Sequence, residues 1–168
     1  MPTTTARFVT GEGGEQIEVL GTVMQLVATV DDTAGTYEVA VVTAGQGGDL
    51  IPHRHPWEEF YFVLDGVLEV HVGARVHEAG PGSFVTMPPR ALHAFRVLSE
   101  GARFLHVSFG PGASAAFRDF AAEVSSSPDL EELPVILDIN RRHGIELVIP
   151  PELLDLAEVL TGAELTAS

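Results

Sequence analysis

The chain has 168 residues and a mass of 17.9 kDa, which gives room for one domain with an appendage. It carries 24 acidic and 9 basic residues, a net charge of −15, and contains neither lysine nor cysteine. These absences exclude a lysine Schiff base, a phosphate-binding lysine, a thiolate nucleophile, a disulfide and a cysteine-ligated metal. The negative charge disfavours nucleic acid and anionic membrane surfaces as partners. No apolar run is long enough for a membrane span and no secretory signal is visible, so we expect a cytoplasmic protein.

Short apolar runs rich in Val, Phe and Thr, separated by glycine or proline, predict β-strands over residues 17–109. We expect strands at Thr22–Val30, Thr36–Ala44, Glu59–Leu64, Leu68–Val72, Ser83–Met87, His93–Leu98 and Arg103–Phe109. The pairs Asp65-Gly66 and Gly73-Ala74 predict two tight hairpin turns. Many short strands without an intervening helical pattern favour an antiparallel all-β sandwich or barrel.

The pattern becomes helical after Pro111. Ala113–Val124 carries apolar residues at helical spacing and predicts an amphipathic helix. Ser127 can cap a second helix that ends near Gly144, and Pro134 predicts that this helix kinks or starts afresh there.

The last residues continue this change of pattern. Ile145–Ile149 is expected to be extended, and Glu152–Leu160 to form a last helix. We therefore divide the chain into a barrel domain over residues 1–112 and a C-terminal helical extension over residues 113–168. Residues 118–168 have a net charge of −8, which we interpret as a solvated helical surface.

Three histidines and one carboxylate have the spacing of a metal site. His53 and His55 are separated by one residue, which places both imidazoles on one face of an extended strand. Glu59 heads the next predicted strand, and His93 follows a Gly-Pro turn and a further strand. Three neutral imidazoles and one carboxylate suit a divalent transition metal ion: iron, manganese, nickel, copper or zinc. The alternative is that the histidines bond to each other or to water at a barrel mouth.

These residues resemble the two sequence motifs of the cupin family. The first motif is matched by Gly47, His53, His55, Glu59 and Gly66, and the second by Gly82, Pro88 and His93. The chain departs from the second motif at Arg90, where a glycine is common, and at Val97, where an asparagine is common. The resemblance spans about residues 35–110. It implies a double-stranded β-helix, the cupin jelly-roll barrel, with His53, His55, Glu59 and His93 as inward-pointing ligands of one metal ion.

Strand alternation around Glu59 agrees with this barrel. Tyr61 and Val63 share the inward face of Glu59, whereas Phe60 and Phe62 point to the opposite surface. We expect these two phenylalanines to lie under the C-terminal helices or a partner subunit. Since cupins often dimerise through such a surface, we expect a homodimer.

Glu59, Tyr61 and His106 are the candidates for catalytic roles. Tyr61 can orient a substrate oxygen or pack with a satisfied hydroxyl. His106 can project into the barrel as a base beside the metal or serve as a structural histidine. Arg90 can meet an anionic substrate or pair with the acidic surface, and His143 has a sufficient explanation in the dipole of the helix that it ends.

The resemblance implies a metal-dependent enzyme that acts on a small organic molecule. The leading interpretation is a dioxygenase-like oxidoreductase, in which the metal binds an enolate or catecholate oxygen pair and dioxygen at open positions. The C-terminal tail resembles those of some small bacterial cupins of the quercetin-dioxygenase type, but this likeness carries little functional weight. One alternative is a polyketide cyclase or isomerase that uses a zinc-type metal to polarise a carbonyl. Another is a non-enzymatic ligand-binding cupin. A transcription factor is disfavoured because no paired DNA-binding helices or basic patch accompany the barrel.

Overall fold

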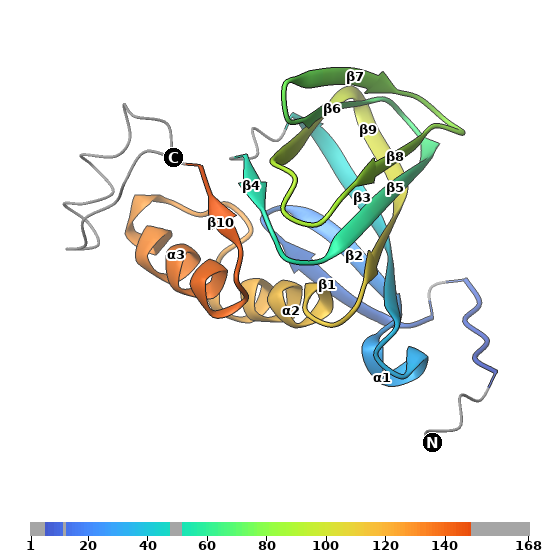
Figure 1. The fold of residues 1–168 in the computed structure, drawn as a ribbon, viewed down its shortest axis with the longest axis horizontal. Helices are drawn as coiled ribbons and strands as arrows, with labels where there is room; N and C mark the ends of the chain where they lie inside the picture. Colours follow the sequence, from blue (N-terminus) through green and yellow to red (C-terminus); the bar gives the residue numbers. More distant parts are fainter. Residues whose placement is uncertain (1–5, 12, 48–51, 149–168) are drawn as a thin grey trace.

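The computed structural model describes residues 6–11, 13–47 and 52–148, and its strands form an antiparallel barrel with two helices along one side (Figure 1). The strands are β1 (Glu15–Val19), β2 (Thr22–Ala28), β3 (Tyr37–Gly47), β4 (His53–Arg54), β5 (Glu58–Asp65), β6 (Leu68–Val72), β7 (Arg75–Ala79), β8 (Phe84–Met87), β9 (His93–Phe109) and β10 (Glu146–Leu147). The helical segments are α1 (Val30–Thr33), α2 (Ala113–Glu123), the 3₁₀ turn η1 (Leu130–Glu132) and α3 (Leu133–Arg142). The predicted β-barrel with a helical C-terminal part is confirmed.

The long strand β9 joins the two sheets of the barrel. Its second half pairs with β3 on one side and with β5 on the other, and β1, β2 and β8 extend that sheet. Its first half pairs with β4 and β6, and β10 and β7 extend the second sheet. The sequence predicted two separate strands here, His93–Leu98 and Arg103–Phe109. They form one strand because its pairing with β3 continues through Ala102 and Gly101 and, after a register shift, resumes at Val97.

The two predicted turns have different outcomes. Gly73-Ala74 joins β6 to β7 in a hairpin, with Val72 opposite Arg75. The prediction of a hairpin at Asp65-Gly66 is wrong, because β5 and β6 pair with different halves of β9 and not with each other. Gly66 instead forms the corner where the chain crosses between the sheets, with a φ of 76°.

The core lies between the two sheets, extends to α2 and α3, and follows the predicted alternation on β5. Glu59, Tyr61 and Val63 are buried inside the barrel, and Phe62 is exposed on the outside. The buried hydrophobic residues that form the core are Val19, Met24, Leu26, Ala40, Val42, Ala44, Tyr61, Val63, Leu68, Val70, Ala79, Met87, Val97, Ala102, Phe104, Phe120 and Ile139.

The helical extension packs beside the barrel, with α2 against β1 and α3 against α2. Helix α3 begins with Pro134 in its first turn. Of the two outcomes predicted for Pro134, a kink or a new start, the structure shows the new start. The predicted cap at Ser127 is wrong, since Asp129 caps the turn η1 that precedes α3. The predicted helix Glu152–Leu160 lies outside the described residues. Within the described part of the chain, no helix has the length and hydropathy needed to cross a membrane.

We predict that Gly66→Ala destabilises the fold far more than Gly73→Ala does. Both glycines have positive φ, but a Cβ at Gly66 would lie 2.2 Å from the carbonyl oxygen of Gly101, whereas a Cβ at Gly73 meets nothing within 4 Å. The expected losses in the free energy of unfolding are about 3 kcal/mol for Gly66→Ala, from left-handed strain plus overpacking, and about 1 kcal/mol for the control. Urea unfolding measures both, and equal losses would contradict the role of Gly66 as the corner.

Candidate metal centre

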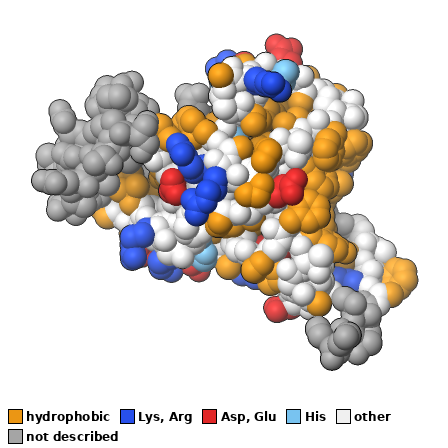
Figure 2. All heavy atoms as spheres, viewed as in Figure 1, with side chains coloured by type: hydrophobic (Ala, Val, Ile, Leu, Met, Phe, Trp, Pro, Cys, Tyr) orange, Lys and Arg blue, Asp and Glu red, His pale blue; other side chains and the backbone are white. Residues whose placement is uncertain are grey.

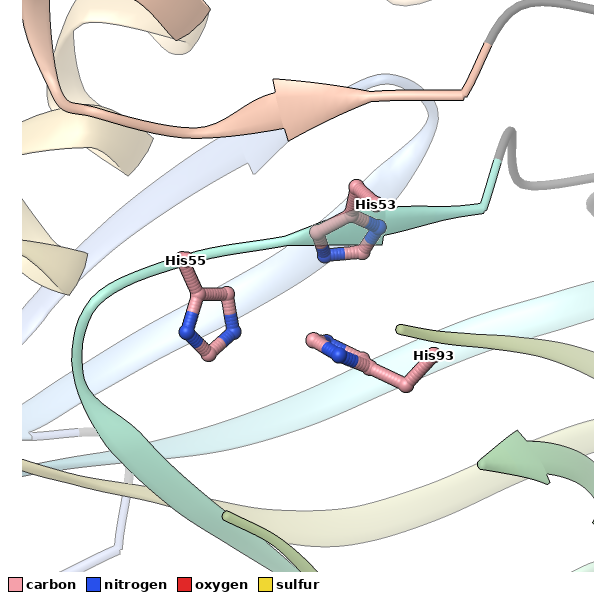
Figure 3. Close-up of side chains that lie close together, drawn as sticks. All are labelled: His53, His55 and His93. Carbon is pink, nitrogen blue, oxygen red and sulfur yellow. The ribbon is translucent and has the colours of Figure 1, made fainter. Parts of the chain in front are cut away.

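Three histidine rings converge between β4 and the start of β9 (Figure 3). His53 on β4 lies directly opposite His93 on β9, and His55 follows β4 by one residue. One ring nitrogen of each lies within 4.8 Å of the other two. His55 and His93 are 3% and 2% exposed, whereas His53 is only half-buried. The cluster therefore meets solvent at His53.

The backbone fixes the orientation of the two buried rings. Nδ1 of His55 is 3.0 Å from the carbonyl oxygen of Trp57, and Nδ1 of His93 is 2.8 Å from that of Ala91. Because a carbonyl oxygen only accepts hydrogen bonds, each Nδ1 carries the proton and donates it. Each Nε2 then presents a lone pair to the cluster. Neither of these two buried Nε2 atoms makes a well-directed hydrogen bond among the described residues. Rings anchored through one nitrogen with the other directed inward are typical of metal-ligating histidines, so the donor set fits a divalent metal ion.

The carboxylate of Glu59 lies beside the cluster, inside the barrel. Its oxygens are 3.0 Å from Nε2 of His93 and 3.2 Å from Nε2 of His55. Burial opposes ionisation of Glu59, but the charge and hydrogen bond of His106, with the contacts of His55 and His93, hold its pKa well below the usual range. Since a lone pair and a carboxylate repel each other, this arrangement requires a proton or a metal cation between them.

Two further side chains hold Glu59 in place. Nε2 of His106 lies 2.7 Å from one carboxylate oxygen, and the hydroxyl of Tyr61 donates to the other at 3.1 Å. Burial, and then the charge and hydrogen bond of Glu59, raise the pKa of Tyr61 well above its usual value, so the phenol keeps its proton and donates. His106 thus projects into the barrel, and both candidate catalytic side chains contact Glu59.

Trp57 supports His55 and was missed by the sequence analysis. Its indole stacks on the imidazole of His55 with ring centroids 4.3 Å apart and planes 10° from parallel. Gly112, which precedes α2, lies against the other part of this indole, and a Cβ there would lie 3.0 Å from the ring. The one available signal was that the single tryptophan of the chain follows His55 by two residues.

The two departures from the cupin motif have structural explanations. Arg90 has a φ of 62°, the left-handed conformation that a glycine adopts freely, at a cost of about 1 kcal/mol. Its guanidinium binds Glu146 at 2.9 Å, so the structure shows the second of the two readings of Arg90, pairing with an acidic group of the same chain. Val97 is buried in the core.

Three other histidines lie outside the cluster. His71 binds Glu69 at 2.7 Å, and His143 at the end of α3 binds Asp119 of α2 at 2.7 Å. His77 is exposed on β7. His71 and His143 therefore pair with carboxylates, His77 faces solvent, and none of the three belongs to the cluster.

Comparisons with known proteins agree with this architecture. Residues 40–108 match the family model of the cupin domain. This matched cupin domain runs from β3 to β9 and includes the three histidines and Glu59 of the candidate metal centre. The comparison with curated proteins found no match.

Solved structures share the fold at low sequence identity. KdgF from Halomonas sp. aligns with a TM-score of 0.59 and 18% identity over 66% of this chain and 99% of its own. An RmlC-like cupin from Shewanella frigidimarina NCIMB 400 gives 0.56 and 20% over 66% and 96%. The polyketide cyclase RemF from Streptomyces resistomycificus gives 0.54 and 22% over 62% and 80%. At these identities the likeness extends to the fold alone.

We predict that His53→Ala weakens metal binding more than tenfold, because it removes one of three imidazole donors. His77→Ala, which removes an exposed histidine on β7, is the matched control and should bind metal as the wild type does. Metal content after dialysis against a weak chelator measures both variants. Unchanged stoichiometry in His53→Ala would contradict its assignment as a ligand.

The pH dependence of stability should differ between metal-free and metal-loaded protein. Burial alone lowers the pKa of His93, but the hydrogen bond and charge of Glu59 outweigh it and raise the pKa above 6.5. A raised histidine pKa stabilises the metal-free fold below about pH 6.5, and this contribution disappears as the pH rises through the raised value. Metal competes with that proton, so metal-loaded protein should lose stability as the pH falls through the same range.

Thermal unfolding of wild type and His93→Gln, each with and without metal, isolates this contribution. In metal-free protein, the difference in melting temperature between the wild type and His93→Gln should shrink from about pH 6 to about pH 8. In metal-loaded protein, this difference should grow over the same range. An advantage that is independent of pH in both states would contradict the coupling of His93 to Glu59.

Proposed function

We propose that this chain binds one divalent transition metal ion through His53, His55 and His93, with Glu59 as the anionic donor. The observation that carries the proposal is the pair of buried Nε2 atoms that lie 3.0 and 3.2 Å from a buried carboxylate without a well-directed hydrogen bond. The candidate ions are iron, manganese, nickel, copper and zinc, because imidazole and carboxylate donors suit all of them.

We further propose that the site is that of a metal-dependent enzyme acting on a small organic molecule. When bound, the metal supplies Lewis acidity at coordination positions that the protein leaves open. A substrate with paired oxygens, such as an enol, a catechol or a dicarbonyl, suits such positions. The walls of the barrel exclude water from His55 and His93, and the half-buried His53 marks the side from which a substrate enters. A dioxygenase-like reaction is the first candidate.

A second candidate, a cyclase or isomerase reaction without oxygen, is favoured by the contact between Glu59 and His106. A buried carboxylate can take a proton from a carbon next to a polarised carbonyl, and the imidazole 2.7 Å from it can return a proton to the product and then recover one from the carboxyl group. The same fold serves the polyketide cyclase RemF. A non-enzymatic ligand-binding cupin is the third reading, for which binding without turnover is expected.

Oxygen uptake separates these candidates. Apoprotein is reloaded anaerobically with each metal in turn and mixed with enol, catechol and 1,3-dicarbonyl compounds in an oxygen electrode. Dioxygenase activity predicts stoichiometric oxygen consumption that His93→Ala abolishes and His77→Ala retains. Product formation without oxygen uptake would contradict the dioxygenase proposal and support the cyclase or isomerase.

We also propose that the protein is a cytoplasmic homodimer that associates through the outer face of β5, β8 and β9. Phe60 and its ring neighbours Phe84 and Phe109 lie on this face, and Phe84 is 59% exposed. Figure 2 shows hydrophobic side chains gathered on the side of the molecule where β5 and β8 lie in Figure 1. The C-terminal helices pack elsewhere, so a second copy of the chain is the expected cover.

We predict a mass of twice 17.9 kDa at micromolar concentration in sedimentation equilibrium. Phe84→Glu should shift the protein toward monomer, since it places a charge in an interface that should bury upwards of ~1,200 Å². Val76→Glu, at a residue 53% exposed on β7, is the matched control and should remain dimeric. A monomeric wild type, or equal dissociation of both variants, would overturn the proposed interface.

A further inference from the structure

The C-terminal extension returns to the candidate metal centre after the cupin domain has ended. The family match stops at residue 108, yet β10 of the extension pairs with β4, the strand that carries His53. Leu147 lies opposite His53, and the N–H of Val148 donates to the carbonyl oxygen of Pro52 at 2.8 Å. Figure 3 shows β10 running beside the strand that bears His53.

The pairing with β10 matters because β4 is only two residues long. On its other side β4 pairs with β9 through a single register position, His53 opposite His93. A strand with so few ladder bonds opens easily when one neighbour is lost. The backbone that carries His53 therefore depends on β10 for much of its restraint.

Glu146 links the two segments that carry the histidines. Its carboxylate lies 2.9 Å from the guanidinium of Arg90 and 3.8 Å from that of Arg54 on β4. Arg90 precedes His93 by three residues, and its backbone N–H donates to the carbonyl oxygen of His55 at 2.8 Å. Exposed ion pairs add little to the stability of a fold. This contact matters instead because it joins the segment that carries His53 to the segment that leads into His93.

Two half-buried residues of the extension contact the remaining members of the site. Gly112, the N-cap of α2, lies against Trp57, which stacks on His55. Phe117 of α2 meets the ring of His106 edge-on, with centroids 5.3 Å apart, and His106 holds Glu59.

We propose that the C-terminal extension is a working part of the metal centre: β10 and Glu146 position the histidine ligands, and metal binding and docking of the extension stabilise each other. The proposal rests on the proposed metal site. Because coupling between two binding events is reciprocal, a contact of the extension that improves metal affinity is itself strengthened by metal.

Cobalt titration of the full-length chain tests the first half of the proposal. Glu146→Gln removes the charge that bridges Arg54 and Arg90, and Arg90→Gly removes the side chain while relieving the left-handed strain. Both variants should bind Co²⁺ about tenfold more weakly than the wild type, the range found for residues that orient metal ligands. Their visible Co²⁺ spectra should change in intensity, because the arrangement of the donors changes.

A matched control separates positioning from general stability. Glu123→Gln removes an ion pair of the same kind, with Arg142 at 2.6 Å, inside the extension and away from β4. It should bind Co²⁺ with wild-type affinity and spectrum. Arg90→Gly should unfold at a temperature equal to or above that of the wild type while binding metal more weakly, which a purely structural role would not produce.

Hydrogen exchange tests the reciprocal half. Saturating metal should slow exchange of the backbone amides in residues 113–148 of the wild type by about tenfold, and by less in Glu146→Gln. Wild-type affinity and spectrum in both Glu146→Gln and Arg90→Gly would overturn the inference while leaving the metal site intact. A wild type that binds no metal would overturn the metal site itself, and the inference with it.

Discussion

The buried carboxylate of Glu59 is the constraint on which the rest of the centre depends. The residue is 3% exposed inside the barrel, where an ionised carboxylate without compensation costs several kcal/mol. His106 and Tyr61 satisfy one oxygen each, and the contacts of His55 and His93 complete its surroundings. With the pKa of Glu59 held low, the negative charge persists at neutral pH and attracts a cation to the histidine side.

That cation is either a proton or a metal ion, and the backbone favours the metal. The carbonyl groups of Trp57 and Ala91 fix the Nδ1 protons of His55 and His93, so both Nε2 atoms offer lone pairs to one point. A proton on His93 satisfies one of these atoms, as its raised pKa reflects. A divalent ion satisfies both and offsets the charge of Glu59 as well. The fold thus presents neutral donors and one anion to a common centre.

The parts that the sequence predicted well follow local rules. The spacing of His53 and His55, and the alternation that places Glu59, Tyr61 and Val63 inward, depend only on the period of an extended strand. Short strands with glycine and proline between them predicted an antiparallel sandwich or barrel, and the resemblance to cupins selected the barrel. The inward position of His106 was one of two stated readings. Alternation along a strand does not reveal which side chain His106 contacts.

The parts that could not be predicted depend on pairings between distant segments. Glu146 and Leu147 carry no local signal that they pair with β4, because two-residue strands form only when the tertiary fold brings them together. The Asp65-Gly66 pair has the local signature of a hairpin, but β9 offers its two halves as better partners for β5 and β6. The same long-range arrangement brings Glu146 to Arg90 and makes the C-terminal extension a neighbour of the histidines.

X-ray absorption spectroscopy of the protein loaded with one equivalent of cobalt or zinc tests the central claim most directly. The account predicts a first coordination shell of nitrogen and oxygen, with the outer-shell scattering of three imidazole rings from His53, His55 and His93. The ring contribution should fall to two in His93→Ala. A shell without imidazole scattering, or one unchanged by that substitution, would contradict the assignment of this histidine cluster as the metal centre.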